Sequence, residues 1–233
     1  MPAHRVALIQ REALDREDPQ RRVPIAEAFW WAEEDHGLLG EVGSYNTPKD
    51  RHGEYRGGTI GASPAYSFTA HIADLSVDVE TGVTTVHKVW VAHDCGQALS
   101  RRIVEGQMEG SVYMGFAEAI MEEHVVDPEH NGEHTGPSLL DYRMPTFLDT
   151  PDIEALIVEA PDAQGPYGAK EAGEGPLHPI IPAIANGIYD AVGVRIDRLP
   201  FSPPRVLAAI QAREAEVAAG HVQPHKTNAR RAG

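Results

Sequence analysis

Two alternating segments, 68–79 and 83–94, place the strongest constraint on how this chain folds. They flank a turn at Glu80-Thr81-Gly82, and alternation of apolar and polar residues puts successive side chains on opposite faces of a strand. The pattern predicts a β-hairpin with one buried face. One face is expected to carry Ala73, Leu75, Val77 and Val79, and the other Asp74, Ser76 and Asp78.

Helical periodicity appears on both sides of this hairpin. Pro24 suits the first position of a helix that ends at Gly37. A longer helix is expected over 102–123, with an apolar ridge and a parallel line of small residues that lets another backbone approach closely. The ridge is Met108, Val112, Phe116 and Ile120, and the small residues are Ser111, Gly115 and Ala119.

The remaining elements complete a mixed architecture. A strand is predicted over 153–159, a helix over 179–191, and a last helix with Ser202 as N-cap and Pro203 as its first residue. Together these predict an α+β fold of mixed sheets with packed helices. We expect a charged arm over 1–22, one domain over 23–212 and a polar, disordered tail over 213–233.

Composition excludes several classes of function. The net charge is −15, from 35 acidic and 20 basic residues, which argues against nucleic acid as a partner. No apolar stretch approaches 18 residues and the N-terminus lacks a signal-peptide core, so we expect a cytoplasmic protein with no membrane partner. Cys95 is the single cysteine, so this chain alone cannot ligate an iron–sulfur cluster.

The glycine-rich segment 165–176, GPYGAKEAGEGP, is the first candidate site. Glycines let a backbone approach a ligand, and Lys170 supplies a point charge. Glu174, between Gly173 and Gly175 and just before an apolar helix, is expected to be partly desolvated, which favours work as a general base. A tight surface turn remains open as the alternative, and the segment fits neither a Walker A loop nor a dinucleotide fingerprint.

The histidines and the cysteine favour structural roles. Twelve histidines show no H-E-x-x-H motif and no clear helical pair, so no metal ligand is expected from this chain. His93 and Asp94 stand at a strand end, where we expect a structural turn. Cys95 follows them and is expected to be a small buried residue.

Three segments resemble, in the same order, the carboxy-terminal part of the molybdopterin-binding large subunit of molybdenum hydroxylases. They are 93–123 (HDCGQALSRRIVEGQMEGSVYMGFAEAIMEE), 138–153 (SLLDYRMPTFLDTPDI) and 168–207, which begins GAKEAGEGPLHP. The family includes xanthine dehydrogenase, aldehyde oxidoreductase, carbon monoxide dehydrogenase and 4-hydroxybenzoyl-CoA reductase. The resemblance covers about residues 23–210.

The resemblance implies a set of site residues. Glu174 matches the glutamate that stands beside the molybdenum, so it is the implied catalytic base. Gln107 matches a glutamine that contacts the cofactor, and we place it near the amino end of its helix, where an anionic group is favoured. The other implied cofactor-binding residues are Gly168, Ala169, Lys170, Glu171 and Gly173.

The implied function is that of a catalytic fragment of a heteromeric molybdenum hydroxylase. It hydroxylates an electron-poor carbon of a heterocycle, aldehyde or aromatic substrate at a molybdenum–molybdopterin centre, in the plain or a dinucleotide form. Iron–sulfur clusters and FAD are expected on partner subunits. Purines, N-heterocycles, aldehydes and aromatic thioesters are all compatible, and either direction of electron flow is open.

Family large subunits are several times longer than this chain. We therefore expect a split large subunit, completed by a partner chain that carries the other cofactor loops. Two rival hypotheses remain. One is a non-catalytic scaffold subunit of such a complex, and the other is a free-standing small enzyme that binds a phosphorylated ligand in the glycine-rich loop.

Overall fold

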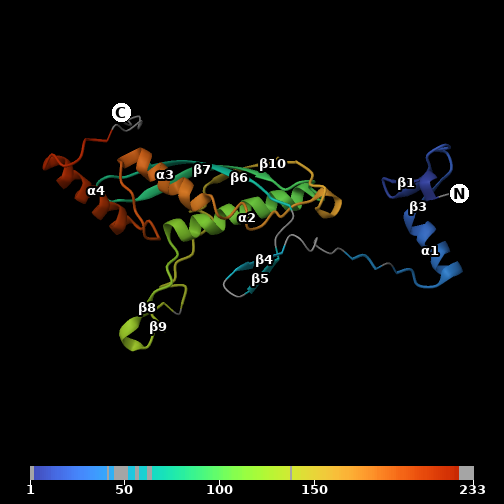
Figure 1. Cartoon of the computed structure of the whole chain (residues 1–233), viewed down its shortest axis with the longest axis horizontal. Helices are drawn as coiled ribbons and strands as arrows, with labels where there is room; N and C mark the ends of the chain where they lie inside the picture. The colour runs from blue at the N-terminus through green and yellow to red at the C-terminus, as the bar shows by residue number, and fades with distance from the viewer. Residues whose placement is uncertain are drawn as a thin grey trace. The chain divides into compact units, whose positions relative to one another are not determined.

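The structure is a computed structural model that describes residues 3–40, 42–44, 52–55, 58–61, 65–136 and 138–225. The chain forms two compact units, Met1–Asn46 and Thr47–Gly233, and most of their helices and strands are labelled in Figure 1. The predicted boundary at residue 22 therefore differs from the division that the contacts give.

The first unit contains a small sheet and a helix. A 3-10 turn η1 (Ala3–Arg5) leads into an antiparallel sheet of β1 (Val6–Ile9), β2 (Glu12–Asp15) and β3 (Arg22–Pro24), followed by α1 (Ile25–His36). We expected a charged arm over 1–22, and the described part of it forms strands in which some of these charges pair with each other. Arg5 lies 2.5 Å from the fully buried Asp15 and lowers the pKa of that carboxyl.

The second unit is built on a three-stranded mixed sheet. Its order is β10 (Asp152–Val158), β7 (Thr84–Asp94), β6 (Thr69–Val77), with β6 antiparallel and β10 parallel to β7. The predicted hairpin and its buried face are confirmed, except that Val79 lies in the turn and is exposed. β10 first pairs at Lys88, so no described strand lies beside Thr84–His87 on that side.

Smaller elements extend from this sheet. Two short hairpins are formed by β4 (His52–Tyr55) with β5 (Gly58–Gly61) and by β8 (Val126–Asp127) with β9 (Glu133–His134). A 3-10 turn, η3 (Pro128–His130), joins β8 to β9. Another 3-10 turn, η4 (Pro166–Gly168), lies in the glycine-rich segment.

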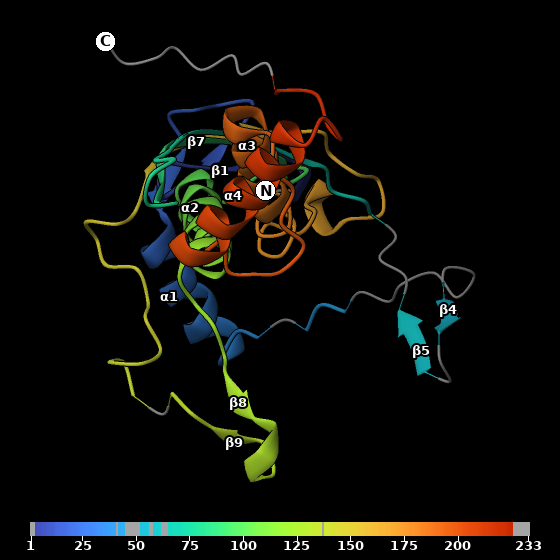
Figure 2. The same cartoon turned by 90° about the vertical axis from the view of Figure 1, so that its left-hand side faces the viewer.

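Two helices pack on one face of the sheet. α2 (Arg101–Ile120) contacts β7 and β10, α3 (Ile180–Val192) contacts β6, and the two helices contact each other. Figure 1 shows α2 running along the strands, and Figure 2 shows the same elements end-on. α4 (Pro203–Ala218) contributes Val206 and Ile210 to the core. The predicted α+β class is confirmed.

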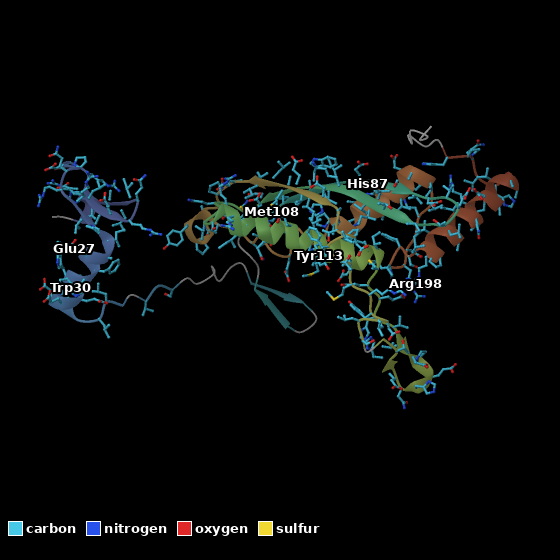
Figure 3. All side chains as sticks on the ribbon, turned by 180° about the vertical axis from the view of Figure 1, so that it is seen from behind. Glu27, Trp30, His87, Met108, Tyr113 and Arg198 are labelled. Atoms are coloured by element: carbon cyan, nitrogen blue, oxygen red, sulfur yellow. The ribbon has the colours of Figure 1, made fainter. Side chains whose placement is uncertain are left out.

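The two stripes predicted on α2 are also confirmed. Met108, labelled in Figure 3, and Val112 are fully buried. On the line of small residues, a Cβ at Gly115 would lie 2.1 Å from Cγ2 of Ile180, so α3 approaches as closely as a glycine permits.

A hydrogen bond joins α2 to the segment before β10. Tyr113, also labelled in Figure 3, donates it over 2.7 Å to the carbonyl of Pro145.

Two sequence expectations need correction. α2 begins at Arg101, so Gln107 lies in its second turn, beyond the first four N–H groups that a helix leaves without an internal partner. α4 continues to Ala218, so the start of the predicted tail over 213–233 is helical, while residues 226–233 lie outside the described residues. Within the described residues, no helix combines the length and the apolar character needed to cross a bilayer.

We expect Gly115→Ala to lower the free energy of unfolding by about 1–3 kcal/mol, because the added methyl would overpack the contact with Ile180. Gly110→Ala is the matched control, since a Cβ there would meet nothing within 4 Å. That change should raise stability by about 0.5–1 kcal/mol through helix propensity. Urea unfolding measures both, and equal effects at the two glycines would contradict the close contact.

Candidate functional site

The glycine-rich segment is attached to the edge of the sheet where the parallel strands β7 and β10 end. Gly96 and Ala169 form an isolated β-bridge, Lys170 N–H donates to the carbonyl of Cys95 at 2.8 Å, and Gln97 N–H donates to that of Gly168 at 2.9 Å. Cys95 is buried, as expected, and burial raises the pKa of its thiol. This attachment brings residues 168–170 onto the turn that follows β7.

An ion pair reinforces the attachment. Lys170 Nζ lies 2.5 Å from Asp94 Oδ2, and both side chains are almost fully buried. Burial alone would raise the pKa of Asp94, but the Lys170 ammonium and hydrogen bonds from the amides of Gly96 and Ala160 lower it. The expectation that His93 and Asp94 begin a structural turn is confirmed. Lys170 was expected to supply a point charge to the cofactor. Because Asp94 already pairs with its ammonium, that contact stays a prediction.

The amide groups of this part of the segment are also used internally. Gly168 N–H donates to the carbonyl of Gly165 at 2.8 Å, and Ala169 N–H donates to that of Pro166 at 3.0 Å. With Lys170 N–H bonded to Cys95, the donors of residues 168–170 stabilise the fold. Their predicted contact with the cofactor stays a prediction, and it would have to use other atoms.

Glu171 organises the next part of the segment. Its Oε2 accepts hydrogen bonds from the amides of Gly173 at 3.0 Å and Gly175 at 3.2 Å, and its Oε1 accepts one from Ser67 Oγ at 2.5 Å. Burial alone would raise the pKa of Glu171, but these donors and the nearby His93 lower it. The carboxylate thus binds the main chain on both sides of Glu174.

Glu174 itself is exposed. The expectation that the neighbouring glycines and helix desolvate it is not met within this chain. Its carbonyl accepts hydrogen bonds from Leu177 N–H at 3.1 Å and from His178 Nδ1 at 2.7 Å, so the residue stands at the start of an ordered turn. Water would have to be removed from the carboxylate by groups other than those that the described residues supply.

Gln107 on α2 lies beside this turn. A Cβ at Gly173 would stand 3.5 Å from Gln107 Nε2, and Ser111, one helical turn further, donates a hydrogen bond of 2.7 Å to the carbonyl of Gly173. Gln107 is exposed. Gln107 and Gly173, which lie more than sixty positions apart in the sequence, are therefore neighbours. Together with Glu174 they form one open surface.

Several contributors were not predicted as site residues. His93 is fully buried, and its ring nitrogens contact Thr69 Oγ1 at 2.7 Å and the carbonyl of Glu171 at 2.8 Å. Ser67 and Ser111 hold the turn from outside it. His93 could have been identified from the sequence, because it is a polar residue on the inner face of a predicted buried strand. Nothing in the sequence spacing pointed to Ser67.

Comparisons with known proteins show the family of the chain. A model of the molybdopterin cofactor-binding domain family matches residues 3–151, more than half of the chain. The chain belongs to this family. The match ends before the glycine-rich segment, so the role of Glu174 is not part of it.

Individual relatives match about two thirds of the chain. The xanthine dehydrogenase molybdenum-binding subunit of Escherichia coli O157:H7 is 36% identical over 158 residues, which are 65% of this chain and 21% of that protein. The aldehyde oxidoreductase of Megalodesulfovibrio gigas is 35% identical over 148 residues, 63% of this chain and 16% of that one. The chain spans about a fifth of the length of these relatives.

A solved structure matches most of the chain. Quinoline 2-oxidoreductase from Pseudomonas putida 86 superposes with a TM-score of 0.65 and 25% identity, over 90% of this chain and 26% of that chain. The described residues present no group of three or more His, Cys, Asp or Glu that could hold a metal ion.

The open surface fits a molybdopterin group in part. Gln107 offers an amide that can donate and accept, and Gly173 leaves the space beside it free of a side chain. Gly106 and Gly110 on α2 leave further open space, since a Cβ on either would meet nothing within 4 Å. Lys170 is paired with Asp94, so its contact with the anionic part of the cofactor stays a prediction.

We expect Lys170→Met to lower the free energy of unfolding by about 3 kcal/mol, because the buried Asp94 carboxylate loses its counter-charge. The double variant Asp94→Asn, Lys170→Met should be less destabilised than the sum of the single changes. Lys88→Met is the control, since Lys88 pairs with Asp152 and Glu154 near the surface and should matter less. Additive single effects in urea unfolding would show that the pair does not interact.

A pH dependence is expected from His71, whose two ring nitrogens are buried without a hydrogen-bond partner among the described residues. Burial, aided by His93, lowers the pKa of His71 to about 4. The unfolded chain therefore binds the proton first, and stability should fall by on the order of 2 kcal/mol as the pH drops from about 6.5 to about 4.

His71→Leu should flatten that part of the pH dependence, whereas His87→Leu, at an exposed position, should preserve it. The free energy of unfolding at pH 7, 6 and 5 gives the comparison. The same slope in wild type and His71→Leu would exclude His71 as its source.

Proposed function

We propose that this chain is a catalytic part of a heteromeric molybdenum hydroxylase, and that it encloses a molybdopterin centre together with a partner chain. The observation that carries the proposal is the meeting of Gln107 and the Gly173–Glu174 turn on one open surface. These are residues that the family resemblance assigns to the cofactor and to catalysis. Their proximity required the packing of α2 against a loop more than sixty residues away.

Each residue has a distinct part in the proposed site. Gln107 and the main chain at Gly173 would hold the cofactor, and Glu174 would take up a proton from the reacting group as general base. A bound molybdenum–molybdopterin centre supplies the two-electron redox chemistry that hydroxylation of an electron-poor carbon requires. The substrate class that we propose is a heterocycle, an aldehyde or an aromatic compound.

The proposal of a shared centre is supported by exposed apolar surface. Leu139, Leu140, Phe147 and Leu148 are each at least 74% exposed, although they lie in or next to the family match. Apolar surface of this kind is typical of a site that another protein covers. We propose that the chain with the remaining cofactor loops covers it and excludes water from Glu174.

The proposed reaction also needs carriers that accept its electrons. A cysteine-ligated cluster needs more thiolates than the single Cys95 provides. We therefore propose an iron–sulfur subunit and a flavin subunit as the other components of the complex.

Glu174→Gln tests the catalytic assignment. In the assembled complex, the change should lower kcat by at least about 100-fold, because it removes the base but keeps the shape of the side chain. Molybdenum content should stay near the wild-type value. Glu216→Gln, on the exposed face of α4, is the control and should keep full turnover.

Near-normal turnover in Glu174→Gln would remove the proposed role of Glu174. A wild-type complex that assembles and binds the cofactor without turnover would favour the scaffold hypothesis instead.

A further inference from the structure

His93 lies buried beneath the proposed catalytic turn, and Glu171, whose side chain is 43% exposed, lies beside it at the surface. His93 is the penultimate residue of β7 and is fully buried. Glu171 is three residues before Glu174 in the segment above it. The two are linked by the hydrogen bond of 2.8 Å between His93 Nε2 and the carbonyl of Glu171.

The partners of His93 define its tautomer. A carbonyl oxygen accepts hydrogen bonds and cannot donate them, so Nε2 must carry the hydrogen. In the neutral ring, Nδ1 is then an acceptor, and the hydroxyl of Thr69 donates to it at 2.7 Å. Thr69 thus selects the form of His93 that can bind Glu171.

The partners of Glu171 define the turn. Its carboxylate accepts the amides of Gly173 and Gly175, the two residues that flank Glu174. The enclosure is tight, because a Cβ at Gly175 would lie 2.1 Å from Glu171 Oε1 and 3.0 Å from His93 Cε1. Ser67 holds the other carboxylate oxygen from outside the segment.

We propose that Thr69, His93 and Glu171 form a hydrogen-bonded support that positions Glu174 through its main chain. This inference rests on the proposed function of Glu174. It assigns Glu171 to the support of the turn and not to contact with the cofactor, and it makes His93 a positioning residue. The charged and titratable groups around the support are His71, Asp94 and Lys170.

The support can be tested on the full chain without the cofactor. In the ¹⁵N-labelled protein, the ring nitrogen shifts should identify His93 as the Nε2–H tautomer, and Thr69→Val should introduce the Nδ1–H form. A wild-type His93 in the Nδ1–H form would overturn the proposal, and this result needs no variant to fold.

Hydrogen exchange then tests the link to the turn. The amides of Gly173 and Gly175 should exchange about tenfold faster or more in Glu171→Ala and in His93→Phe. His93→Gln should restore slow exchange, because its amide can donate to the carbonyl of Glu171, while a merely space-filling role would favour Phe over Gln. His87→Phe, on the same strand, is the control and should leave both amides unchanged.

Unchanged exchange in Glu171→Ala, or equal exchange in His93→Phe and His93→Gln, would overturn the support. In the assembled complex, His93→Phe should lower kcat by about tenfold to 100-fold with little change in KM, and His93→Gln should recover most of it. If the exchange experiments show no support but Glu174 is essential for turnover, this inference alone is rejected. If the exchange experiments show the support but turnover does not need Glu174, the proposed function alone is rejected.

Discussion

The attachment of the glycine-rich segment to the turn after β7 is the constraint on which the candidate site depends. Asp94 and Lys170 come from positions 76 residues apart, and their buried ion pair joins the end of a strand to the start of the segment. A buried pair of this kind adds specificity more than stability, since each charge is costly without the other. Because residue 170 is held in place, the turn that follows it is presented beside α2.

The groups of the site divide into two sets with different chemistry. The amides of residues 168–170 and the carboxylate of Glu171 are used in internal hydrogen bonds. Gln107 and Glu174 are exposed, and no side-chain hydrogen bond engages either of them among the described residues. Such a division suits a surface that is rigid before its ligand and partner arrive, because little ordering remains to be done on binding.

Periodicity allowed the hairpin, the helices and both stripes on α2 to be predicted from sequence, since each depends on neighbouring residues. The N-terminal sheet was not predicted, because its charges looked like solvated surface until Arg5 and Asp15 were brought together. The same limit applied to Lys170, whose partner is distant in the chain. The candidate Glu174 came from the family resemblance, whereas its exposure depends on which surfaces this chain leaves open.

The parallel pairing of β10 with β7 has a consequence for association. Pro151 has no N–H to extend the ladder, and the described strands leave Thr84–His87 with a free edge beside a cavity of about 620 Å³. A free strand edge invites pairing with any extended chain that meets it, including misfolded copies. The half-buried Lys88 at the first paired position, together with the proline, would act as a gatekeeper against such fibre-like growth.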